Sequence, residues 1–292
     1  MAHQHQHSSG KNLKLAFFLN VGFTILEIIG GLITNSVAIL SDALHDLGDS
    51  ISLGISWFLN RKSTQESNDS FTFGYKRFSL LGAHINSLVL IGGSVFIISE
   101  AIQRLQHTQP SNAEGMLVFA LIGVAVNGYA AWKLSSGKTL NEKVVSWHLI
   151  EDVLGWVAVL IVSIVLLFTD LYFLDPALSI LITLYVLYNV LKRLRETLFV
   201  FLQGKPNEID LEEVIRKIKE DPKVQSLHHT HLWSLDGESH VFTTHIRLQN
   251  VGSFEEVIAC KERLKEMLQR EYHFSHYTIE TELDRESCSL QP

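Results

Sequence analysis

Long apolar stretches alternate with short polar breaks over the first 204 residues of the chain. Each stretch reaches or approaches the ~20 residues that a helix needs to cross about 30 Å of hydrocarbon. One such stretch could belong to a soluble core, but a succession joined by breaks as short as Thr34–Asn35–Ser36 does not fit a soluble fold. The pattern predicts a polytopic α-helical membrane protein with six transmembrane helices, at 13–34, 37–59, 78–101, 116–134, 144–168 and 171–191.

The remainder of the chain has shorter apolar segments, which follow the periodicity of helices and strands in a small folded domain. Helical periodicity covers 209–220 and 253–271, and alternation typical of strands covers 229–234, 241–248 and 277–283. Asp236–Gly237 supplies a turn between the first two strands. The order αββαβ predicts an α+β domain with its helices on one face of a sheet. We therefore divide the chain into an N-terminal tail that contains histidines (1–12), a transmembrane domain (13–200), a small α+β domain (205–285) and a C-terminal tail (286–292).

Charge separates the two parts further. The chain is only 19% charged, and residues 205–292 hold 17 acidic and 11 basic side chains, so this part carries −6 of the net charge of −7. Lys and Arg between the apolar stretches fall almost entirely on one predicted side of the membrane, and the other side has only Arg104. By the positive-inside rule, both termini are cytoplasmic and the protein is expected in the cell (inner) membrane. Cys260 and Cys288 then face a reducing compartment as free thiols.

Two of the predicted spans carry the same ionisable pattern, His-x-x-x-Asp. His45 and Asp49 lie in the second span, and His148 and Asp152 lie in the fifth. A spacing of i to i+4 places both side chains on one helix face, and ionisable residues inside a membrane are costly enough to require a reason. Two such helices facing each other would offer two imidazole nitrogens and two carboxylates, which suits tetrahedral Zn²⁺. Buried His–Asp hydrogen bonds between helices are the alternative, but the duplication favours a metal site.

A metal site within the membrane indicates passage of the metal, and the chain has no ATP-binding motif to drive it. Zinc binds neutral imidazole and ionised carboxylate, so its entry displaces protons, which is the physical basis of antiport. A passive metal channel and an intramembrane metal-dependent enzyme are the alternatives. The absence of HExxH and a set of four protein ligands favour transport, because catalytic zinc keeps an open position. We expect no enzyme activity.

These motifs, together with Ser41-Asp42-Ala43 and the stretch from Phe73 to Arg77, make the chain resemble the cation diffusion facilitators over nearly its whole length. The resemblance implies six helices, a metallochaperone-like cytosolic domain, a homodimer and export of cytoplasmic zinc in exchange for protons. Two His and two Asp resemble the zinc-selecting branch, although Cd²⁺ and Co²⁺ also fit such a site. The loop before the third span has Phe71 and Tyr75 where some members have histidines, so no metal site is predicted there.

Half of the 14 histidines lie in the predicted cytosolic domain, and Leu227–Trp233 resembles the family motif at its first strand. Strands of one sheet can bring such histidines together, and alternation places Glu280 and Glu282 on one face. The predicted ligands of a second, regulatory zinc are His228, His231, His245, Glu280 and Glu282, whereas His229, His240 and His273 are predicted not to bind. His3, His5 and His7 either deliver metal or play no part. The expected partners are divalent metal ions, protons and the lipid bilayer, and no nucleic acid.

Other polar residues of the spans have roles that the sequence leaves open. Asp46 and Glu151 either collect cations beside the transport pair or bond to polar groups of neighbouring helices. Asn20 and Asn127 are expected to make hydrogen bonds between helices. Glu27, in the first span, either lines the cavity or has no part in transport.

Overall fold

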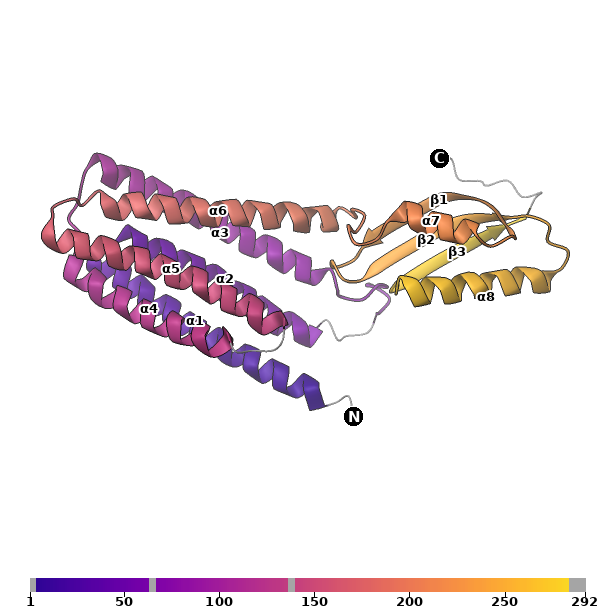
Figure 1. Ribbon diagram of the computed structural model, residues 1–292, viewed down its shortest axis with the longest axis horizontal. Coiled ribbons are helices and arrows are strands. Elements are labelled where there is room, and N and C mark those ends of the chain that lie inside the picture. The colour runs from indigo at the N-terminus through magenta and orange to yellow at the C-terminus, as the bar shows by residue number, and fades with distance from the viewer. Residues whose placement is uncertain (1–3, 63–66, 136–139, 284–292) are drawn as a thin grey trace. The chain divides into compact units, whose positions relative to one another are not determined.

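The structure is a computed structural model that describes residues 4–62, 67–135 and 140–283 (Figure 1). Within these ranges, the side chains at 4–16, 53, 56–57, 59–62, 134–135 and 140–148 lie outside the description. The chain forms two compact units. One unit comprises 1–65 and 82–194, and the other comprises 66–81 and 195–292.

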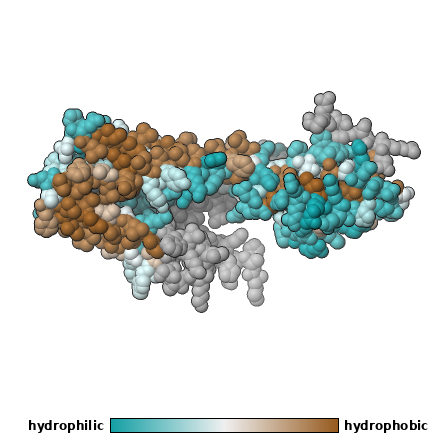
Figure 2. All heavy atoms as spheres, turned by 45° about the horizontal axis from the view of Figure 1, so that its top comes forward, coloured by the Kyte–Doolittle hydropathy of each residue, from teal (hydrophilic) through white to brown (hydrophobic). Residues whose placement is uncertain are grey.

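Six long helices form the first part of the chain, in agreement with the six predicted spans. They are α1 (Gln4–Thr34), α2 (Val37–Lys62), α3 (Phe78–Gln106), α4 (Ala113–Ser135), α5 (Leu140–Phe168) and α6 (Leu174–Phe201). Within the residues that the structure describes, α1, α3, α4, α5 and α6 are long and apolar enough to cross a membrane. The helix α2 has 26 residues, and Asp42, Asp46 and Asp49 lower its apolar character. Apolar side chains cover the visible face of the helical part, as a lipid-facing surface requires, whereas polar side chains cover much of the second unit (Figure 2).

Close packing between helices positions α2 and α5. The helices α1 and α2 pack along each other, as do α4 and α5, and smaller contacts join α1 to α4 and α2 to α5. Gly123 of α4 allows this approach, because a Cβ atom there would lie 2.1 Å from Cδ2 of Trp156. Trp156 is 1% exposed and belongs to a cluster with Ala38 and Ile39 of α2 and with residues of α4 and α5. These contacts determine which faces of α2 and α5 turn toward each other.

The N-terminus of α2 is held by α6. Asp175 accepts hydrogen bonds from the backbone N–H of Val37 at 2.8 Å and from the Ser36 hydroxyl at 2.5 Å. An acidic side chain at this end of a helix satisfies backbone donors and complements the helix dipole. This contact ties the start of α2 to the start of α6.

The second unit has the predicted αββαβ order. It contains α7 (Leu211–Lys219), β1 (Val224–Ser234), β2 (His240–Leu248), α8 (Phe254–Glu271) and β3 (His276–Glu282). The sheet order is β1-β2-β3, with β1 antiparallel and β3 parallel to β2. The first strand begins five residues before the predicted start, because Val224 already pairs with Leu248.

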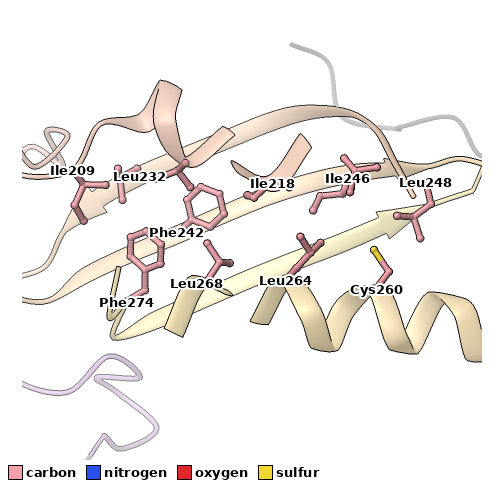
Figure 3. Packing of buried hydrophobic residues seen from close by; sticks show 12 residues of the cluster. Ile209, Ile218, Leu232, Phe242, Ile246, Leu248, Cys260, Leu264, Leu268 and Phe274 are labelled. Atoms are coloured by element: carbon pink, nitrogen blue, oxygen red, sulfur yellow. The ribbon is translucent and has the colours of Figure 1, made fainter. Parts of the chain in front are cut away.

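One hydrophobic core holds this unit together (Figure 3). Phe242 and Ile246 of β2 pack with Leu264 and Leu268 of α8, and Ile218 of α7 joins the same cluster. Because both helices contribute to one cluster, they cover the same face of the sheet, as predicted. The opposite face is left to polar residues, which include the histidines described below.

Candidate metal sites

The first candidate site lies between α2 and α5. His45 Nε2 is 3.9 Å from Asp49 Oδ2 on the same helix and 3.8 Å from Asp152 Oδ1 on α5. All three side chains are partly buried. The structure thus brings together three of the four residues of the predicted transport site from two helices. The side chain of His148 lies outside the described residues, and its backbone is one turn before Asp152 on α5.

Asp46 also belongs to this site. Ligand atoms of His45, Asp46 and Asp152 lie within 4.8 Å of one another, so these three could share a metal ion. Asp46 is buried at 7% exposure, and its backbone oxygen accepts a hydrogen bond from Asn20 of α1. Of the two roles considered for Asp46 from the sequence, a position beside the cation fits this geometry.

The surroundings of the site are strongly acidic. Glu27 of α1 is fully buried and Asp42 of α2 is 6% exposed. Glu27 interacts electrostatically with Asp46, Asp42 and Asp152. Several carboxylates around the described imidazole of His45 produce a negative potential that favours divalent cations.

Other polar residues of the spans bond to neighbouring helices. The Tyr185 hydroxyl of α6 donates to Glu151 Oε1 at 3.1 Å, which matches the second of the roles considered for Glu151. The Asn20 side chain donates to Ser50 Oγ at 3.0 Å and so joins α1 to α2, as predicted. Asn86 of α3 donates to Ser52 Oγ of α2 at 2.7 Å.

The second candidate site lies on the polar face of the three-stranded sheet. His228 of β1 pairs directly with His245 of β2, and His245 pairs with Glu280 of β3. Glu282 Oε1 lies 3.0 Å from His228 Nε2 and 3.1 Å from His245 Nδ1. Glu280 Oε2 lies 3.4 Å from His245 Nε2. Three of the five predicted ligands, His228, His245 and Glu282, therefore gather at one point, and Glu280 contacts the other nitrogen of His245. Glu282 is buried at 5% exposure.

His231, the fifth predicted ligand, does not join this group. It pairs with Thr243, two residues along β2 from His245, which places it about 6–7 Å farther along the sheet. The cause is a register shift between His228 and His231, where His229 adopts a left-handed conformation with φ 47°. The His229 ring centroid lies 5.4 Å from the rings of both His228 and His245.

His229 was predicted not to bind, and the structure places its ring beside the rings of His228 and His245. In a regular strand, adjacent residues point to opposite faces, so His229 would be expected to point away from His228. A β-bulge changes this pattern, and nothing in the local sequence indicated one.

The remaining candidates contribute less. Cys260 is a buried free thiol, as predicted. Burial in the core raises its pKa to about 11, and the nearby Asp221 carboxylate adds to this, so the thiol stays protonated and is a poor metal ligand. The side chains of His3, His5, His7 and Cys288 lie outside the described residues.

Comparison with known proteins covers both units. The family description "Cation efflux transmembrane domain" matches residues 13–202, and "Cation efflux protein, cytoplasmic domain" matches residues 206–284. A Bacillus velezensis protein named "Cadmium, cobalt and zinc/H(+)-K(+) antiporter" is 34% identical over 97% of this chain and 92% of its own length. The zinc transporter ZitB of Pectobacterium atrosepticum is 34% identical over 99% of this chain and 92% of its length. The metal cation efflux system protein CzcD of Cupriavidus metallidurans is 35% identical over 96% and 90%.

Proposed function

The chain belongs to the cation diffusion facilitator family, and on this basis we propose that it is a secondary active transporter that exports Zn²⁺ in exchange for protons. Its relatives are named as antiporters and transporters of zinc, cadmium and cobalt, so it is a transporter and not an enzyme. The observation that carries the proposal is the meeting of His45, Asp49 and Asp152 between two helices.

We assign the transported metal to His45, Asp49, His148 and Asp152. Two imidazoles and two carboxylates match the nitrogen and oxygen ligands of tetrahedral zinc. Zinc displaces protons from the imidazoles when it binds, and protons that return to these nitrogens release the metal. Competition at one site therefore links the movement of zinc in one direction to that of protons in the other.

The direction of export rests on the distribution of Lys and Arg. The basic residues between the spans lie on the side of both termini, which makes that side cytoplasmic and places the protein in the cell membrane. The second unit is then cytosolic, where zinc is collected. A homodimer, which the family resemblance implies, completes the assembly.

A second zinc at the sheet would regulate transport. The proposed ligands are His228, His245 and Glu282, with Glu280 close by and His229 as an additional donor. Glu282 Oε1 contacts both imidazoles, and a zinc ion could take the place of these contacts by binding the same nitrogen and oxygen atoms. The site is proposed to sense cytosolic zinc.

Transport in liposomes tests the main proposal. Full-length protein is reconstituted with a pH gradient, and zinc and interior pH are followed together. We expect zinc uptake to be matched by proton movement, and Asp49→Ala and Asp152→Ala to abolish both. The control is Glu151→Gln, which removes a carboxylate from the same helix as Asp152 but one that bonds to Tyr185.

Two results would contradict the proposal. Zinc flux without counterflow of protons would indicate a passive channel. Flux at the wild-type rate in Asp49→Ala or Asp152→Ala would remove the site assignment, whatever the coupling.

A further inference from the structure

Three buried acidic side chains gather inside the helical unit, beside the candidate transport site. Glu27 of α1 is 0% exposed, and Asp42 and Asp46 of α2 are 6% and 7% exposed. Glu27 interacts electrostatically with both Asp46 and Asp42, and Asp42 interacts with Asp46. Asp42 also faces α5, because a Cβ atom at Gly155 would lie 3.5 Å from its Oδ1, so the three carboxyl groups lie where α1, α2 and α5 meet.

The carboxylate of Glu27 lacks the donors that normally accompany such burial. Among the residues that the structure describes, no N–H or hydroxyl group donates to Oε1 or Oε2, and the one side chain within hydrogen-bonding range of Glu27 is another acid, Asp46. Burial of an unpaired carboxylate is strongly unfavourable, and neighbouring carboxylates increase the cost. Buried charges persist in proteins when they are paired or when they coordinate a metal. The Glu27 carboxyl group interacts with two other acids, and a bound cation would neutralise all three.

Neutral oxygen atoms line the same interface between α1 and α2. Thr24 lies one turn before Glu27, and Ser50 lies one turn after Asp46, so each is on the same helix face as the acid. Their hydroxyl oxygens are 3.4 Å apart, and both residues are buried. This region thus offers carboxylate and hydroxyl oxygens.

We propose that Glu27, Asp42 and Asp46 form a second cation site, which takes an ion of the oxygen-preferring class such as Mn²⁺, Mg²⁺ or Ca²⁺. Carboxylate and hydroxyl oxygens suit these hard cations, whereas the imidazole of His45 suits zinc. Asp46 also lies within 4.8 Å of the ligand atoms of His45 and Asp152, so the two sites are neighbours. A cation in one changes the affinity of the other through this shared carboxylate.

Manganese binding to the full-length protein tests this site. Purified protein is first saturated with zinc, so that the sites that contain imidazole are filled, and Mn²⁺ is then titrated while the electron paramagnetic resonance signal of free Mn²⁺ is recorded. We expect one Mn²⁺ per chain beyond the zinc. Glu27→Gln should weaken this binding at least tenfold, because it keeps the shape of the side chain and removes its charge.

The matched control is Glu151→Gln, which removes a carboxylate that is exposed and bonded to Tyr185, and it should bind Mn²⁺ as the wild type does. If Glu27→Gln aggregates in size-exclusion chromatography, Asp42→Asn replaces it. No Mn²⁺ binding by the wild type would mean that protons alone neutralise these acids, and the proposal would be wrong. Unchanged binding in the variants would place the Mn²⁺ elsewhere, and the proposal would again be wrong.

Zinc and proton fluxes are measured on the same preparations. Loss of Mn²⁺ binding with intact zinc stoichiometry would support the second site. A failure of zinc–proton coupling with Mn²⁺ binding intact would instead count against the transport proposal, so the two failures are distinguishable.

Discussion

Glu282→Gln tests the site on the sheet, because it replaces one buried carboxylate by an amide and changes little else. The glutamate is 5% exposed, and its Oε1 lies within 3.1 Å of one nitrogen of His228 and one of His245. The amide of glutamine has nearly the same shape but no charge. Its NH₂ group is a hydrogen-bond donor, so it cannot replace a carboxylate oxygen in one of these two contacts. Hydrogen bonds to charged groups contribute about 1.5–3 kcal/mol each.

The loss of this interaction energy can be expressed as a change in zinc affinity. If the carboxylate is a zinc ligand, the loss of one charged contact of ~1.5–3 kcal/mol weakens zinc binding roughly 10- to 100-fold, since about 1.4 kcal/mol corresponds to a factor of ten. The measurement is isothermal titration of zinc into full-length protein that carries Asp49→Ala and Asp152→Ala, so that binding at the transport site does not contribute.

Glu238→Gln is the control, because it makes the same chemical change on an exposed residue of the turn between β1 and β2. It should leave zinc affinity unchanged. If Glu282→Gln binds zinc as tightly as this control, the carboxylate is not a ligand and the reasoning from its contacts is wrong.

Two further substitutions test the packing that positions the sites. Gly123→Ala would place a Cβ 2.1 Å from the Trp156 ring and should destabilise the helical unit by ~1–3 kcal/mol, which would lower its melting temperature in detergent. Its control is Gly128→Ala, which should be tolerated because a Cβ there meets nothing nearer than 4.0 Å. Phe242→Ala removes a side chain from the centre of the core of the second unit, at a cost of ~3–5 kcal/mol, and should speed proteolysis of this unit in the full chain. Its control is Phe254→Ala, which should not, because Phe254 is 73% exposed. Equal behaviour within either pair would contradict the packing described.

The acidic surroundings of the transport site have a consequence for metal selection. Carboxylate oxygens of Asp46, Asp49 and Asp152 lie near a single described imidazole, that of His45. Tetrahedral nitrogen and oxygen sites accept Cd²⁺ and Co²⁺ as well as Zn²⁺, and geometry and availability decide among them. The name of the Bacillus velezensis relative includes all three metals, which is the range expected of such a ligand set.

Much of the fold and part of the site follow from local rules that the sequence states directly. The thickness of a bilayer sets the length of each span, so six apolar stretches predict six helices. The i to i+4 spacing puts His45 and Asp49 on one helix face whatever the helix packs against. Alternation likewise places Glu280 and Glu282 on the same face of β3, where both contact His245.

Tertiary structure decided which residues from different elements meet. The rotation of α1 and α2 about their own axes, set by their packing, brings Glu27 and Asp46 together, and no spacing along the chain encodes that rotation. A β-bulge turns His229 toward the histidine cluster, while His231 is left one pair farther along the sheet. Periodicity is a property of one element, whereas a metal site needs ligands from several, so the sequence identified candidates such as His45 and Glu282, and packing determined which side chains meet.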